Sequence, residues 1–323
     1  MTEPLQDAAM YPMGFGQILE RIFHLLRQHF RLFLSVAAVP AAAFFVFYAV
    51  VGGALFLVGV FPPHPGAPDP MTMFSVMFPA MLIGGICLSA VFALGLAAGN
   101  RAALEVDAGQ PSTFRGVYSS VWRQPRRYVG LLMWIYFRSF LPALAIFLLM
   151  FGCVGLMGLL RVKAPPFLFL LLPLGMLLYV AAYIYGIVTA LKLSLAFPAC
   201  IGEGLTARQA LWRSSQLTRG AKGRIFLVLL VGYAVCYVVM MVLFLLVGVV
   251  VVVFALAWSS FHLPSGLSYL GFGIAGVLGF GFMFMTIAMS WAGFATTLAV
   301  LYNDQRVRKD FPAAPQTTPG DTL

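Results

Sequence analysis

The chain has 323 residues, of which 62% are hydrophobic and only 9% are charged, whereas about 25% of residues are charged in an ordinary soluble domain. This composition excludes a soluble globular protein and predicts one that lies in a membrane. Lys and Arg outnumber Asp and Glu by 20 to 10; we expect these bases to face membrane lipids, and we expect no nucleic-acid partner. The cysteines stand singly in apolar stretches, so they predict neither a zinc site nor a disulfide scaffold: Cys87, Cys153, Cys200 and Cys236.

In chain order, the first predicted element is an amphipathic helix over residues 14–31. Its apolar residues recur at helical spacing and its bases lie on the opposite face, so we expect it to lie in the membrane interface. Two later stretches, 112–127 and 206–220, have the same character. The last one begins with a capping-box pattern at Thr206 and ends at Gly220.

Six apolar runs are long enough to cross a hydrocarbon core about 30 Å thick, which takes roughly 20 helical residues. They lie near 32–61, 72–99, 129–160, 167–191, 225–258 and 267–302, and four of them contain a candidate proline kink, at Pro40, Pro79, Pro142 and Pro173. The predicted fold class is an all-α polytopic membrane protein with six transmembrane helices and three interfacial helices. We expect one integral membrane domain over 1–310 and a disordered cytoplasmic tail over 311–323.

The distribution of bases predicts the orientation of the chain. Seventeen Lys and Arg residues fall in the N-terminal segment, in 100–128, in 192–224 and in the C-terminal tail, whereas the segments on the other side hold only Arg161 and Lys163. Because loops rich in bases stay in the cytoplasm, both termini are predicted to be cytoplasmic. The remaining base, Arg138, lies in the third apolar run, where it either has a function or extends its head to lipid phosphate.

The three amphipathic stretches are related by a constant offset of 96 residues, which aligns Arg27, Arg123 and Arg219. The chain then divides into three units, 14–99, 112–191 and 206–302, each with an interfacial helix followed by two membrane helices. We hypothesise an internal repeat in which these three arginines lie at equivalent positions on the inner face, where they contact anionic headgroups. Regular loop lengths in any six-helix protein are the alternative explanation.

The sequence lacks familiar motifs for catalysis and cofactor binding. The sequence has no phosphate-binding Gly-rich loop and no HExxH helix. The stretch "HLPSG" at 262–266 resembles part of a lipid-phosphatase signature, but Leu267 stands where that signature has its histidine. No acidic residue lies at the centre of a span, which argues against a proton-coupled carrier. We therefore predict no enzyme activity, no metal and no cofactor.

Two stretches carry a resemblance to a known family. The first, 202–231, contains Glu203, Gly204, Ala210, Leu211, Arg213, Ser214, Leu217 and Gly220, and the second, "LAVLYNDQRVRKD", contains Leu301, Tyr302, Asp304, Arg306, Arg308 and Lys309. In both, the chain resembles the membrane domain associated with bacterial glycerophosphoryl diester phosphodiesterases, and the stretch "GFGQILERIFHLLRQHFRLFL" is similar to the opening of that domain. The resemblance implies a protein of the bacterial cytoplasmic membrane.

The resemblance does not extend to the phosphodiesterase itself. The catalytic barrel of such an enzyme needs roughly 200 residues or more, whereas the longest segment between spans here has about 30 residues. The leading hypothesis is therefore a standalone, non-catalytic membrane domain that organises anionic lipid or a protein partner at the inner leaflet. The alternative is a transporter or lipid-translocating protein with a path between the repeat units.

The polar seam "LYNDQRVRKD" at 301–310 yields the most specific structural predictions. No Gly or Pro interrupts it, so the last helix is expected to continue through it, with Tyr302 at the headgroup level. Asp304 and Arg308 are four residues apart and can pair within the helix, which leaves Arg306 free. We predict that Arg306 or Arg213 pairs with Glu203 and that Asp304 helps to hold the tail against the 203–220 loop. In the alternative, these charges are solvated.

Overall fold

The computed structural model describes residues 13–57, 70–159, 167–260 and 265–310, and every regular element in these ranges is a helix. The predicted tail 311–323, the bases Arg161 and Lys163 and the "HLPSG" stretch up to Pro264 lie outside the described residues. Within them, six helices are long and apolar enough to cross a membrane. The all-α, polytopic fold predicted from the sequence is confirmed.

Along the chain, short helices alternate with hairpins made of two long helices. The first part of the chain forms α2 (Phe15–Gln28), α3 (Phe30–Leu57), α4 (Pro70–Asp107), α5 (Phe114–Trp122), α6 (Pro125–Leu159) and α7 (Phe167–Leu193). The second part forms α8 (Ala196–Gly202), α9 (Ala207–Leu217), α10 (Lys222–Ser260) and α11 (Ser265–Asp310). Each of the four candidate prolines lies inside a continuous helix.

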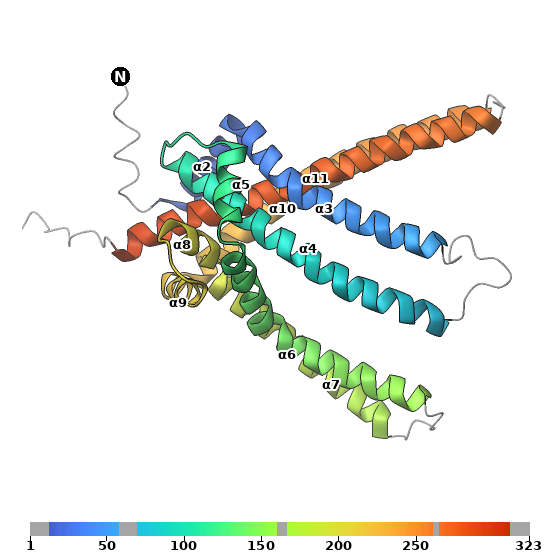
Figure 1. Ribbon diagram of the computed structural model, residues 1–323, viewed down its shortest axis with the longest axis horizontal. Helices are drawn as coiled ribbons and strands as arrows, with labels where there is room; N and C mark the ends of the chain where they lie inside the picture. The colour runs from blue at the N-terminus through green and yellow to red at the C-terminus, as the bar shows by residue number, and fades with distance from the viewer. Residues whose placement is uncertain (1–12, 58–69, 160–166, 261–264, 311–323) are drawn as a thin grey trace, which may run out of the picture.

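The long helices form three hairpins, α3–α4, α6–α7 and α10–α11, which diverge from a common base (Figure 1). The short helices and the final turns of α11 make up this base, and both described ends of the chain lie there (Figure 1). In the most apolar 18-residue stretch of the α11 span, 61% of the residues are buried, against 6% in the corresponding stretch of the α7–α8 span. Helix α11 therefore passes through the protein core, whereas α7 is left largely to the lipid.

Small residues let α4 approach its neighbours closely. A Cβ atom added at Gly95 would lie 2.8 Å from the ring of Pro40, and one added at Gly99 would lie 2.7 Å from the Cβ atom of Ala295. Alanines of α4 are buried around these contacts, among them Ala98. Close approach of helices through small residues is how membrane helices gain packing contacts.

The three amphipathic stretches are helices, as predicted, and the third has the caps expected at its two ends. Gln209 accepts hydrogen bonds from the backbone N–H and hydroxyl of Thr206 at 3.0 and 2.8 Å. Gly220, which follows α9, has a φ of 83°, a conformation that favours glycine.

The apolar faces of these short helices differ from the prediction. They were expected to rest on lipid, but the centre of each face is buried in the protein: Ile18, Ile22 and Leu25 in α2, Val117, Tyr118 and Val121 in α5, and Ala210, Leu211 and Leu217 in α9. The Tyr118 hydroxyl donates a hydrogen bond to the carbonyl of Val36 at 2.8 Å, and burial raises the pKa of Tyr118 well above its ordinary value. Amphipathic spacing does not distinguish a protein core from a lipid surface, because both bury apolar groups.

A short helix followed by a long hairpin occurs three times along the described chain, which is the order that the proposed repeat requires. At the 96-residue offset, helix α8 falls on 100–106, where α4 continues as one helix. The structural equivalence of the three units stays a prediction.

Candidate functional site

Three consecutive residues near the end of α11 contact three different parts of the base. Successive side chains on an α-helix point about 100° apart, so Tyr302, Asn303 and Asp304 face different neighbours. Tyr302 and Asp304 are each only 1% exposed. The first half of the polar seam, residues 301–305, thus lies largely inside the protein, where its hydrogen bonds need partners from the chain itself.

Tyr302 belongs to a cluster that joins α11 to the segment around α9. Its hydroxyl donates a hydrogen bond to Glu203 Oε1 at 2.9 Å. Arg213 Nε lies 3.0 Å from the same Glu203 oxygen, and Arg213 also contacts Asp310 Oδ2 at 2.5 Å. Burial alone would lower the pKa of Arg213, but its hydrogen bonds to Glu203 and Asp310 raise this pKa above its ordinary value.

This geometry confirms the pairing of Arg213 with Glu203 and corrects one other prediction. Tyr302 was expected among lipid headgroups, but its ring is buried against Gly202, where an added Cβ would lie 3.2 Å away. Of the two arginines considered as partners of Glu203, Arg306 is not the one used: its Nε lies 3.8 Å from Asp310 Oδ2, one helical turn away.

Asn303 joins α11 to the end of α4 and to α2. Its side-chain amide donates a hydrogen bond to Asp107 Oδ2 at 2.6 Å, while Arg21 Nε lies 2.8 Å from Asp107 Oδ1. Sequence reasoning did not single out these residues. A signal was present in the spacing, because Asp107 and Glu203 are 96 residues apart and Arg21 and Arg213 are separated by twice that number.

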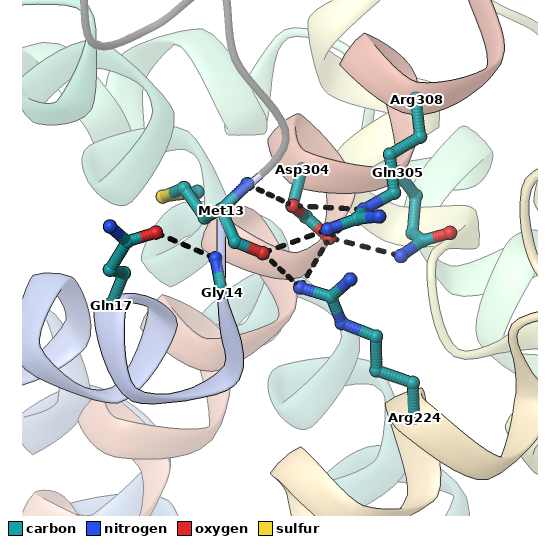
Figure 2. A network of polar contacts seen from close by, with 7 residues as sticks. All are labelled: Met13, Gly14, Gln17, Arg224, Asp304, Gln305 and Arg308. Atoms are coloured by element: carbon teal, nitrogen blue, oxygen red, sulfur yellow. Dashed lines mark hydrogen bonds and ion pairs between the residues drawn. The ribbon is translucent and has the colours of Figure 1, made fainter.

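Asp304 lies at the centre of the third cluster (Figure 2). Its carboxylate accepts hydrogen bonds from the backbone N–H of Met13 at 2.9 Å and from Arg308 Nε at 3.1 Å, and it lies 3.4 Å from the guanidinium of Arg224. The predicted pairing of Asp304 with Arg308 is confirmed. The prediction that Asp304 holds the tail against the 203–220 loop is wrong, because Asp304 faces the start of α2 and of α10.

The tail is held against the 203–220 loop by other residues. Besides the contacts of Tyr302 and Asp310, Lys309 Nζ donates a hydrogen bond to the carbonyl of Arg219 at 3.0 Å. The three arginines related by the 96-residue offset, Arg27, Arg123 and Arg219, are exposed at or just after the C-terminal ends of α2, α5 and α9. A base at this end of a helix is favoured by the helix dipole.

The outer surface of the short helices combines exposed aromatic rings with bases. Phe23 in α2 is 67% exposed, Trp122 in α5 is 61% exposed and Trp212 in α9 is 65% exposed. Each has an exposed arginine four residues away in the sequence that makes no ion pair within the described part of the chain: Arg27, Arg126 and Arg208. We call these six residues the aromatic–basic surface.

Comparison with protein-family models, with curated proteins and with solved structures finds no match. The class of protein therefore rests on the fold and on the base described above. The chain is a multi-pass, all-α membrane protein whose hairpins are joined by a base containing partly buried ion pairs. Among the described residues, no group of three or more His, Cys, Asp or Glu side chains is placed to hold a metal ion.

Proposed function

We propose that the protein is a non-catalytic component of the bacterial cytoplasmic membrane that holds anionic lipid headgroups against α2, α5 and α9 at the inner leaflet. Both termini are then cytoplasmic. Lys and Arg residues are concentrated in the segments at the common end of the three hairpins, and this concentration supports the orientation. The resemblance to the glycerophosphoryl diester phosphodiesterase membrane domain supports the same membrane.

The aromatic–basic surface is the observation that carries this proposal. An exposed aromatic ring is favoured at the headgroup level, which lies at the boundary between the apolar lipid chains and water. A base near an anionic membrane surface contributes about 1 kcal/mol of attraction. In α2 and α9 the ring and the base are one helical turn apart and share a face, as Phe23 with Arg27 and Arg208 with Trp212.

The state of the carboxylates supports a role without catalysis. Asp107, Glu203 and Asp304 each accept hydrogen bonds from two or more donors of the chain. A general acid or base needs access to a substrate proton, and these three groups are already engaged in holding helices together. They are best explained as structural.

The proposal is tested by the lipids that remain bound to the protein. Wild type and the Arg27→Gln/Arg208→Gln variant are purified in a mild detergent from the same membranes, and their phospholipids are quantified by mass spectrometry. At about 1 kcal/mol per base, the variant should bind anionic lipid roughly 20- to 30-fold more weakly. The Arg161→Gln/Lys163→Gln variant is the matched control, since it removes two bases predicted to face the other side. Equal effects of the two variants would contradict the proposal.

The divergence of the three hairpins favours transport or lipid translocation as a second candidate function (Figure 1). A path between the hairpins would let a lipid or neutral solute cross without a charged residue at the membrane centre. The measurement is transbilayer movement of fluorescent lipids in vesicles that contain the purified protein. Movement no faster than in protein-free vesicles rejects lipid translocation.

A further inference from the structure

Two arginines converge on one backbone oxygen in the cluster of Figure 2. The terminal guanidinium nitrogens of Arg224 and Arg308 both donate hydrogen bonds to the carbonyl of Met13, that of Arg308 at 2.8 Å. The two arginines come from the start of α10 and the end of α11, so their convergence depends on the packing of the base. We call Met13, Arg224, Asp304 and Arg308 the Met13 cluster.

The charges of the Met13 cluster do not balance. Two guanidinium groups and one carboxylate leave one positive charge, and the Met13 carbonyl that they share is neutral. The carboxylate of Asp304 is fully buried, while the side chains of Arg224 and Arg308 are 25% and 33% exposed. Like charges held this close repel each other, most of all where water is largely excluded.

Arg224 also has an unused donor. Its Nε atom is buried and has no hydrogen-bond partner among the described residues. A buried donor without a partner costs free energy, and in a native structure it calls for an explanation. A larger acceptor with several oxygens would engage more of the guanidinium donors than one carbonyl oxygen does.

We propose that Arg224 and Arg308 form a binding site for a phosphate group, which displaces the Met13 carbonyl. A phosphodiester with one negative charge would bring the cluster to electrical neutrality. Its oxygens match the donor fork of arginine better than a single carbonyl oxygen does. The phosphate belongs either to a lipid headgroup or to a free phosphate compound. This site shares no residue with the aromatic–basic surface, so it stands or falls independently of the proposed function.

Displacement of Met13 makes the proposal measurable in the intact protein. The Met13 backbone N–H is protected because it donates to Asp304, and it should exchange with solvent once phosphate takes the place of the carbonyl. Hydrogen exchange at Met13 is followed by mass spectrometry on full-length protein in neutral detergent. The probes are inorganic phosphate and dihexanoyl phosphatidylglycerol, a phosphodiester with one negative charge, with sodium chloride at matched ionic strength as the reference.

An increase of at least about tenfold in exchange at Met13 is expected with a phosphate probe and not with chloride. If inorganic phosphate suffices, the ligand is a free phosphate compound; if only the lipid acts, the ligand is a headgroup. Unchanged exchange with both probes at saturation would overturn the proposal.

A binding measurement separates this site from a purely structural tie. Arg224→Gln should weaken binding of the active probe at least about tenfold, since it removes a charge-assisted contact, and Arg224→Lys should restore part of the binding. Arg208→Gln, which changes an exposed base outside the cluster, should leave it unchanged. Equal binding by the Arg224→Gln and Arg208→Gln variants would also overturn the proposal.

Discussion

At the scale of residues, the protein depends on carboxylates that are each shared between helices. Glu203 accepts from Arg213 on α9 and from Tyr302 on α11. Asp304 joins the start of α2 and α10 to the end of α11. Breaking a buried or partly buried pair leaves an uncompensated group, which costs far more than losing an exposed pair. Such contacts should therefore be visible in stability measurements.

Replacing Glu203 by Gln should lower the free energy of unfolding by about 2 kcal/mol, because Arg213 loses one of its two anionic partners. Thermal unfolding in detergent measures the effect. Glu105→Gln is the matched control, since its partner Arg101 lies one helical turn away and both side chains are more exposed. The control should lose less than about 1 kcal/mol. Equal losses in the two variants would mean that the Glu203 cluster is solvated.

Tyr302→Phe removes the hydroxyl that donates to Glu203 and leaves the ring in place. The expected loss is about 1.5 kcal/mol, the contribution of a hydrogen bond to a charged acceptor. Tyr233→Phe provides the comparison, because Tyr233 is 71% exposed and its ring stacks on Tyr237 in the same helix. Its unfolding temperature should match that of wild type. A neutral Tyr302→Phe variant would contradict the importance of this contact.

At the scale of helices, α11 is the element on which the others are assembled. It packs against α2, α3, α4, α8, α9 and α10. Its side chains at the crossing with α4 are small, as is Gly99 on α4 opposite Ala295. A helix that is surrounded on several sides has little room for added atoms.

Gly99→Ala should therefore destabilise the protein by about 1–3 kcal/mol, because the new methyl group overlaps Ala295. Gly130→Ala in α6 is the matched substitution, since nothing lies within 4 Å of a Cβ atom there. It should stabilise the protein by about 0.5–1 kcal/mol through better helix propensity. Thermal unfolding distinguishes the two signs, and stabilisation by both substitutions would refute the close packing of α4 on α11.

At the scale of the whole molecule, three hairpins share one base, and the base joins the two ends of the described chain. The contact between Met13 and Asp304 spans 291 residues of sequence. Loop-closure entropy must be overcome before such a contact forms, so the base is complete only after the last helix has been made.

The orientation of the molecule yields a prediction at this scale. Single cysteines introduced at positions 2, 110, 65 and 262, in a background without the native cysteines, are labelled with an impermeant reagent. Positions 2 and 110 should react only from the cytoplasmic side and positions 65 and 262 only from the other side, because bases are concentrated in the segments on the first side. Labelling of 65 and 262 from the cytoplasm would reverse the proposed topology.

Features that depend on local pattern could be predicted from the sequence. The lengths of the apolar runs predicted the six spans, and the absence of Gly and Pro predicted the unbroken end of α11. The pair of Glu203 and Arg213 was also predicted, since the two residues lie ten positions apart in one short segment. In each case the relevant physical property, hydropathy, helical period or short separation, is contained in neighbouring residues.

Only the tertiary structure decided which side of each element faces the protein. The burial of Tyr302 and the contacts of Asn303 with Asp107 and of Asp304 with Met13 depend on the rotation and packing of α11 against distant helices. The packing of distant helices also decides that each short amphipathic helix buries the centre of its apolar face and leaves an aromatic ring exposed. The helical periodicity of apolar residues predicts that one face of a helix will be covered. The packing of the other helices determines whether protein or lipid covers that face.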